Sequence, residues 1–178
     1  MEPLVEVSVA RLGLDGSTNT YVVILREKEG ERILPIWIGQ PEAESILLEI
    51  NQVRKERPLT HDLCKGLIVG LGAALQRVNI TRVENRTYFA ELHLTRSGEL
   101  YQVDARPSDS IAIALRTGSP MFAAESLLVD PPEETAEQEE ESVIPPSELP
   151  RSTEEMTAEQ LKQYLAGLRP EDFGKFNP

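Results

Sequence analysis

The stretch "DARPSDSIAIAL", Asp104–Leu115, leads from a predicted strand into a predicted helix within a few residues. The preceding "ELYQVDA" alternates polar and apolar side chains as a strand does, while Pro107 and Gly118 are placed to start and stop a helix. A strand end that leads into a helix N-terminus directs backbone N–H groups and side chains to one place, where the helix dipole favours an anion. This junction predicts an α+β fold and marks a place for chemistry.

The polar residues of the junction also have an ordinary structural interpretation. Ser108 or Asp109 can cap the helix, and Arg106 can pair with Asp104 to fix the corner. Capping is the more frequent use of such residues at a helix start. The spacing alone therefore leaves both interpretations open.

A second stretch, "RPLTHDL" (Arg57–Leu63), has the same character. Thr60 suits the N-cap, and His61 falls in the first helical turn, where an imidazole can exchange protons near neutral pH. Asp62 is suited to holding a divalent cation or to complementing the helix dipole. One helical face is predicted to carry Leu63, Leu67, Ile68, Leu71 and Leu75, and the glycines Gly66, Gly70 and Gly72 predict close packing against another backbone.

The remaining pattern predicts a single compact domain over residues 1–129. A meander of strands covers residues 4–12, 20–25 and 32–39, with Pro35 at an edge or a bulge, and a helix follows from Pro41 to about Lys55. Two further strands cover residues 77–85 and 86–96, and residues 120–129 return to the sheet or form coil. The expected class is α+β, with a mixed, largely antiparallel sheet packed against two to three helices.

The C-terminal part differs in composition. Residues 1–129 hold 14 Lys and Arg against 17 Asp and Glu, whereas residues 130–178 hold 4 against 13, so most of the net charge of -12 lies in the tail. Residues 130–156 are predicted to be an acidic, proline-rich disordered linker. Residues 157–178 are predicted to form a short helix and tail whose apolar stripe docks on the body or on a partner protein. The acidity of the whole chain therefore says little about what the body binds.

Several classes of protein are disfavoured by the sequence. Cys64 is the single cysteine, so no internal disulfide forms, and no export signal opens the chain; the cytoplasm is the expected location. The most apolar run, residues 66–75, is far shorter than the roughly 20 residues of a membrane helix. Cys64 among Leu and Ile is read as a buried apolar residue rather than a nucleophile, and His93 inside a strand as a packing or surface residue.

If the two helix starts converge, they would assemble a carboxylate cluster beside basic groups. Asp62, Asp104 and Asp109, with Glu42, would hold Mg²⁺ or Mn²⁺, and His61 would transfer a proton. The flanking basic residues Arg57, Arg106 and Lys65 would steady a phosphate, and the run "VRKER" (residues 53–57) would attract a polyanion. Such a constellation suits hydrolysis of a phosphodiester.

The chain resembles the bifunctional nuclease domain family. The resemblance rests on "LPIWIG" followed by Glu42, on "RPLTHDL", "YFAEL" and "DARPSDSIAIAL", and on Pro120 and Phe122, in that order and spacing. It implies an α+β domain with a mixed sheet, a homodimer, and cleavage of DNA and RNA. The signature polar residues of the family would fall on Glu42, Arg57, His61, Asp62, Asp104, Arg106, Ser108 and Asp109.

Two functional hypotheses follow. In the first, the protein is a metal-assisted nuclease of DNA, RNA or both without strong sequence preference; His61, Asp62, Asp104 and Asp109 are catalytic, and Arg57, Arg106, Ser108 and Lys65 bind substrate. In the second, it is a non-catalytic regulatory module that holds a phosphorylated ligand in the same pocket.

Overall fold

The computed structural model describes residues 2–15, 18–53 and 55–131. Apart from Asp130 and Pro131, the predicted linker (130–156) and C-terminal helix (157–178) lie outside the described residues, as does Arg54 of the basic run. The elements, in chain order, are β1 (Leu4–Asp15), β2 (Thr20–Glu27), β3 (Ile33–Ile38), α1 (Gln40–Ile50), α2 (Thr60–Gly70), β4 (Ala73–Glu84), β5 (Thr87–Arg96), β6 (Glu99–Ala105), α3 (Pro107–Thr117), β7 (Met121–Ala124) and a 3-10 turn, η1 (Glu125–Leu127).

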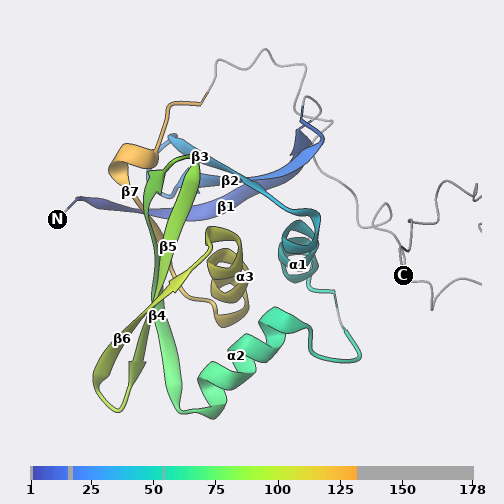
Figure 1. The fold of residues 1–178 in the computed structure, drawn as a ribbon, viewed down its shortest axis with the longest axis vertical. Helices are drawn as coiled ribbons and strands as arrows, with labels where there is room; N and C mark the ends of the chain where they lie inside the picture. Colours follow the sequence, from blue (N-terminus) through green and yellow to red (C-terminus); the bar gives the residue numbers. More distant parts are fainter. Residues whose placement is uncertain (1, 16–17, 54, 132–178) are drawn as a thin grey trace, which may run out of the picture. The chain divides into compact units, whose positions relative to one another are not determined.

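The seven strands form one sheet in the order β3-β2-β1-β7-β4-β5-β6 (Figure 1). Neighbours pair antiparallel except β4 and β7, which are parallel. The predicted α+β class and the mixed, largely antiparallel sheet are therefore confirmed, and β3, which contains Pro35, is an edge strand. The short strand β7 occupies the middle of the sheet, where it joins the N-terminal meander to the β4–β6 meander.

Helix α3 anchors the helical layer to the sheet. It contacts α1 and α2 and packs on β4 and β5 (Figure 1). Its apolar side chains Ile111, Ala112 and Ala114 are buried, as are Ile46 of α1 and Ile80 of β4. The helix ends at Gly118, whose φ of 67° is the left-handed conformation that a glycine adopts without strain, as the sequence predicted.

The other two helices are shorter than the sequence predicted. Helix α1 ends at Ile50 rather than near Lys55, because Gln52 takes a left-handed conformation (φ 52°) that leaves the helix. Helix α2 ends at Gly70, and Gly72 (φ 71°) turns the chain into β4, so Leu75 is a buried strand residue and not part of the helical face.

The close packing expected at Gly66, Gly70 and Gly72 is not found among the described residues. A Cβ added at Gly66, Gly70 or Gly72 would meet nothing within 4 Å. Helix α2 has no buried residue among those described, and Leu63, Leu67 and Val69 are more than half exposed. Among the described residues, α2 therefore presents an apolar surface that no other element covers.

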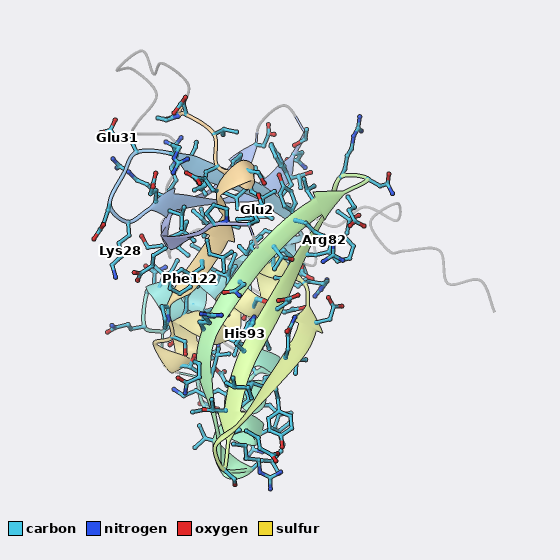
Figure 2. The ribbon with its side chains drawn as sticks, turned by 90° about the vertical axis from the view of Figure 1, so that its left-hand side faces the viewer. Glu2, Lys28, Glu31, Arg82, His93 and Phe122 are labelled. Carbon is cyan, nitrogen blue, oxygen red and sulfur yellow. The ribbon has the colours of Figure 1, made fainter. Side chains whose placement is uncertain are left out.

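Polar side chains of β4, β5 and β6 lie on the opposite face of the sheet. His93 lies on this face (Figure 2), where its Nε2 atom is 2.9 Å from the side-chain nitrogen of Asn79 and 3.3 Å from a carboxylate oxygen of Glu91. His93 is thus remote from the helical layer, in keeping with its interpretation as a surface or packing residue.

In the described part of the chain no helix is both long and apolar enough to cross a membrane.

Candidate functional site

Three helices begin at one cavity of about 590 Å³. Glu42, His61 and Asp109 each lie in the first turn of a helix, α1, α2 and α3 respectively, and all three line the cavity. The complete lining is Pro41, Glu42, Glu44, Ser45, Leu48, Pro58, Leu59, Thr60, His61, Arg106 and Asp109. The N-terminal turn of a helix carries a partial positive charge and unpaired N–H groups. The three helix starts and Arg106 therefore offer donors to an anion, beside the carboxylates of Glu42, Glu44 and Asp109 that also line the cavity.

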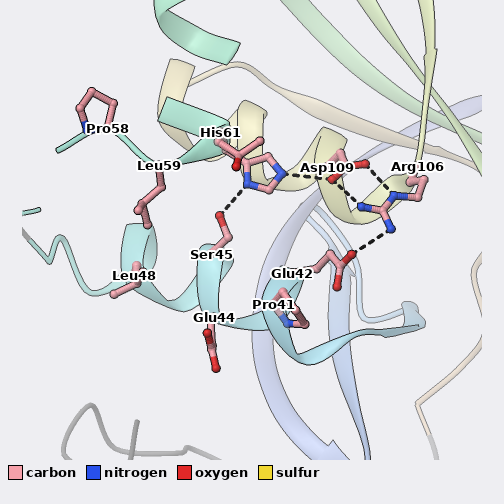
Figure 3. Close-up of a pocket in the computed structure, with 11 residues that line it drawn as sticks. Pro41, Glu42, Glu44, Ser45, Leu48, Pro58, Leu59, His61, Arg106 and Asp109 are labelled. Atoms are coloured by element: carbon pink, nitrogen blue, oxygen red, sulfur yellow. Dashed lines mark hydrogen bonds and ion pairs between the residues drawn. The ribbon is translucent and has the colours of Figure 1, made fainter. Parts of the chain in front are cut away.

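His61 is held between two of these helices (Figure 3). Its Nε2 atom lies 3.1 Å from Oδ1 of Asp109 on α3, and its Nδ1 atom lies 2.7 Å from Oγ of Ser45 on α1. The side chain is only 12% exposed. The imidazole therefore has a fixed orientation at the edge of the cavity, as proton transfer to or from a bound substrate requires.

Arg106 links the carboxylates of Asp109 and Glu42. Its Nε and Nη2 atoms donate to the two oxygens of Asp109 at 2.7 and 3.0 Å, and its Nη1 atom lies 2.8 Å from Oε1 of Glu42 (Figure 3). Burial raises the pKa of Asp109, but the hydrogen bonds from Arg106 and His61 outweigh it and lower that pKa below its ordinary value. Asp109 is therefore an ionised acceptor, and the same pairing raises the pKa of Arg106.

The capping interpretation of the junction is corrected by this geometry. Arg106 itself is the N-cap of α3, without a side-chain cap hydrogen bond, and it pairs with Asp109 and Glu42 where a pairing with Asp104 was expected. Leu59, not Thr60, is the N-cap of α2. At the junction, the side chains of Arg106 and Asp109 thus line the cavity, and neither Ser108 nor Asp109 is the N-cap of α3.

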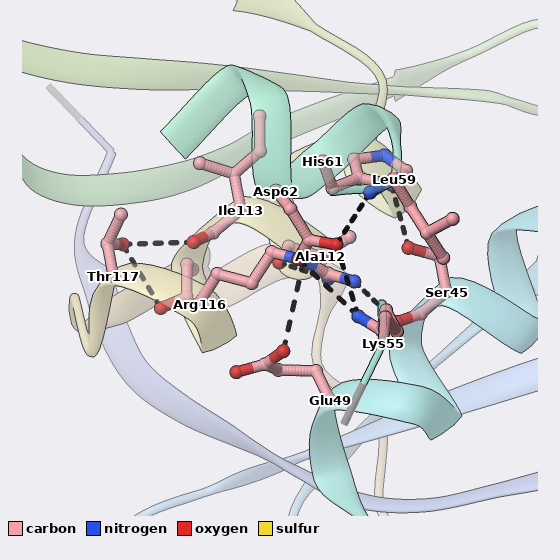
Figure 4. A network of polar contacts seen from close by, with 11 residues as sticks. Ser45, Glu49, Lys55, Leu59, His61, Asp62, Ala112, Ile113, Arg116 and Thr117 are labelled. Carbon is pink, nitrogen blue, oxygen red and sulfur yellow. Dashed lines mark hydrogen bonds and ion pairs between the residues drawn. The ribbon is translucent and has the colours of Figure 1, made fainter. Parts of the chain in front are cut away.

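Asp62 faces away from the cavity into a buried network (Figure 4). Its Oδ1 atom accepts a hydrogen bond from Nε of Arg116 at 2.7 Å, and its Oδ2 atom accepts from the backbone N–H of Leu59 at 2.9 Å and lies 3.3 Å from Nζ of Lys55. The Arg116 side chain is 1% exposed. Arg116 also donates to the carbonyl oxygens of Ser45 and Ala112, so its guanidinium connects α1, α2 and α3.

The pKa of Asp62 reports the strength of this network. Burial raises it, yet the Leu59 N–H, Arg116 and Lys55 together lower it from 3.8 to about 2. A folded-state pKa below the unfolded value stabilises the folded protein at neutral pH, and the contribution is lost as the pH falls from about 4 towards 2.

The other predicted site residues are not brought together with His61. Asp104 pairs with Glu91 across the β5–β6 ladder, and since directly opposed residues share a face, it lies on the face of Glu91 and His93, away from the helices. Arg57 and Lys65 are exposed and do not line the cavity. Ser108 is buried and lines a smaller neighbouring pocket that shares Glu42 and Arg106 with the first.

The positions of the carboxylates determine whether they can bind the predicted metal ion together. Within residues 2–15, 18–53 and 55–131, no three His, Cys, Asp or Glu side chains are grouped so as to hold one. Asp62 is engaged by Arg116, Asp104 is on the other face, and the Arg106 guanidinium lies between Glu42 and Asp109. The carboxylates as arranged do not fit Mg²⁺ or Mn²⁺, and assistance by either ion stays a prediction.

Two residues of the site were missed by the sequence analysis. Ser45 lies among the residues of an ordinary amphipathic helix, and Arg116 is an unremarked basic residue in the last turn of α3. The only available signal for Arg116 was a charged residue one helical turn beyond Ala112, on the apolar face of α3. Neither position carries a local motif, because their partners come from other helices.

Replacing Asp62 by Asn should destabilise the protein in a pH-dependent way. At pH 7 we expect the free energy of unfolding in urea to fall by about 3 kcal/mol, because Arg116 keeps a buried charge without its main partner. The deficit should shrink as the pH falls from about 4 towards 2, where the wild-type carboxylate is protonated.

The matched control is Glu84→Gln, which breaks an exposed pair with Arg82 and should cost less than about 1 kcal/mol. Equal unfolding free energies for wild type and Asp62→Asn at pH 7 would contradict the proposed importance of the network.

Comparison with known proteins bears out the resemblance. Residues 23–135 match the family described as "Bifunctional nuclease domain". The chain is 40% identical over 172 residues to a protein of Mycobacterium tuberculosis (strain ATCC 25618 / H37Rv) that is described only as uncharacterized, an alignment that covers 94% of this chain and 97% of the relative.

Plant relatives match over part of their length. Bifunctional nuclease 2 of Oryza sativa subsp. japonica is 33% identical over 109 residues, which are 59% of this chain and 34% of that protein. Bifunctional nuclease 2 of Arabidopsis thaliana is 28% identical over 103 residues, 56% of this chain and 31% of that protein. The matched family region contains β4–β7 and all three helices that form the cavity, and the chain belongs to the bifunctional nuclease domain family.

Proposed function

We propose that the protein hydrolyses phosphodiester bonds of DNA, RNA or both in the cavity at the three helix starts, without strong sequence preference and in the cytoplasm. The observation that carries the proposal is the hydrogen-bonded chain from His61 through Asp109 to Arg106 at the wall of that cavity. Family membership and the names of the plant relatives support the same activity.

Arg106 is suited to binding the phosphate. Its side chain is 64% exposed, and its bonds to Asp109 and Glu42 use three of the five N–H donors of a guanidinium. The remaining donors, together with the N–H groups at the start of α2, can bind phosphate oxygens. The two carboxylates fix the guanidinium in place, which reduces the reorganisation needed when charge develops on the phosphate.

His61 is suited to moving the proton. Asp109 orients the imidazole through the contact with Nε2, and the apolar side chains of Leu48 and Leu59 line the same cavity. The alternative, a non-catalytic module for a phosphorylated ligand, is favoured by one observation: Arg106 is already paired with two carboxylates, as a purely structural arginine would be.

A cleavage assay separates these functions. Labelled single- and double-stranded DNA and RNA are incubated with wild type, His61→Ala, Asp109→Asn and the matched control His93→Ala, whose imidazole lies on the opposite face of the sheet. We expect His61→Ala to lose about 10²-fold or more in rate, in the range of general acid–base catalysis, and His93→Ala to cleave as wild type does. Equal cleavage by all four proteins would reveal a contaminating nuclease. Mononucleotide binding without cleavage would support the non-catalytic module.

We further propose that the active form is a homodimer, as the family resemblance implies. The supporting observation is the apolar surface of Leu63 and Leu67 on α2, together with Tyr101 and Val103 on the exposed edge strand β6. An edge strand and apolar side chains that no described residue covers are typical of a protein–protein interface.

The prediction is that Leu67→Glu converts a particle of two chains into one of a single chain in light scattering coupled to size exclusion. Val83→Glu, which places the same charge at an exposed apolar position near the far end of β4, should remain a dimer. A wild-type particle of one chain at micromolar concentration would contradict the proposal.

A further inference from the structure

Ser45 contacts His61 at the cavity and has no role in the reaction proposed above. It lies in the second turn of α1, is only 7% exposed, and lines the cavity. Its hydroxyl oxygen is 2.7 Å from Nδ1 of His61, a shorter contact than the 3.1 Å between His61 Nε2 and Asp109 (Figure 3). A serine hydroxyl, an imidazole and a carboxylate are therefore connected in one hydrogen-bonded chain.

The direction of the hydrogen bonds in this chain is fixed by its carboxylate end. Asp109 accepts two hydrogen bonds from Arg106, and an ionised carboxylate has no proton to donate. Nε2 of His61 must therefore carry the hydrogen that faces Asp109. In the neutral imidazole Nδ1 is then an acceptor, so the Ser45 hydroxyl donates its hydrogen to it. The proton that His61 is placed to remove is the proton of Ser45.

We infer that Ser45 is the nucleophile of the site, activated by His61 and oriented through Asp109. The inference rests on the proposed function and deepens it, because it specifies hydrolysis in two steps through a covalent phosphoserine diester. A nucleophile within hydrogen-bond reach of a base, which a third group orients in turn, is the general signature of such chemistry. The imidazole nitrogens are used in the opposite sense from the Ser-His-Asp arrangement of serine proteases, where Nε2 faces the serine.

In the first step the Ser45 oxygen bonds to phosphorus, and its proton moves to Nδ1 of His61. The bond from phosphorus to the departing sugar oxygen breaks, and that oxygen takes the proton from His61. In the second step water attacks phosphorus, gives a proton to Nδ1, and the bond to the Ser45 oxygen breaks with return of that proton to Ser45. Water is the only co-reactant, and no oxidation or reduction occurs.

These steps need positive charge near phosphorus, in a cavity whose lining holds Arg106 beside the carboxylates of Glu42, Glu44 and Asp109. The carboxylates do not fit a divalent ion as they are arranged, so the positive charge near phosphorus comes from Arg106 and the helix starts. Cleavage that proceeds through Ser45 should accordingly continue in the presence of a chelator.

The first experiment measures the reactivity of Ser45 independently of nuclease activity. The full-length chain is incubated at about pH 8 with an alkyl fluorophosphonate, which loses fluoride when an activated serine oxygen attacks phosphorus, and the intact mass and the modified peptide are determined. We expect one phosphonyl group on Ser45 in wild type and none on Ser45→Ala or His61→Ala. The matched control is Ser110→Ala, which removes a fully buried serine hydroxyl that lacks a hydrogen-bond partner; it should react as wild type does.

The second experiment measures cleavage of DNA and RNA in chelator by the same proteins, with thermal melting to confirm that each variant is folded. We expect Ser45→Ala to lose about 10²-fold or more in rate and Ser110→Ala to retain the wild-type rate. An unmodified Ser45 in wild type, or a folded Ser45→Ala that cleaves as fast as wild type, overturns the inference. Modification of Ser45 in a protein that cleaves neither polymer supports the activated serine and refutes the nuclease function.

Discussion

The buried guanidinium of Arg116 is the contact on which the helical layer depends. It lies at the C-terminal end of α3 and donates to the carboxylate of Asp62 on α2, to the backbone carbonyl of Ser45 on α1, and to Ala112 within its own helix. A buried charge requires such partners, since desolvation without them costs several kcal/mol. The arginine thereby connects three helices, of which α2 has no buried residue of its own among those described.

The site follows from that arrangement. Asp62 and His61 are consecutive in α2, so their side chains leave the first turn in different directions: Asp62 into the buried network and His61 towards the cavity. Ser45 likewise uses its carbonyl for Arg116 and its hydroxyl for His61. The structural network and the proposed catalytic chain thus share Ser45 and meet at the consecutive residues His61 and Asp62, so disturbing the first should displace the second.

Local patterns predicted the elements of the fold well. Pro35 marked the edge strand, Gly118 marked the end of α3, and the alternation of residues 86–105 marked strands β5 and β6. The predicted ends of α1 and α2 were wrong where backbone conformation decides them, at Gln52 and Gly72. A residue in the left-handed conformation does not alter the pattern of apolar residues from which helix ends were predicted. The central place of β7 was also beyond prediction, since it depends on pairing with strands far away in the chain.

The site was predicted only in part for the same physical reason. Sequence placed His61 and Asp109 at two helix starts, and these do meet. It could not show that Asp104, five residues before Asp109, lies on the opposite face of the sheet, since strand alternation gives a side only after the pairing is known. Ser45 and Arg116 were missed because their importance lies in contacts 16 and 54 residues away along the chain.

The central claim is that His61 is held in one orientation, with a hydrogen on Nε2 facing Asp109 and an unprotonated Nδ1 facing Ser45. Nitrogen-15 NMR of the imidazole at about pH 8.5 tests it directly, and assignment is simple because His93 is the only other histidine. The account predicts that Nε2 of His61 has the shift of a protonated ring nitrogen and Nδ1 that of an unprotonated one. The reverse pattern, or an average of the two tautomers, would contradict it.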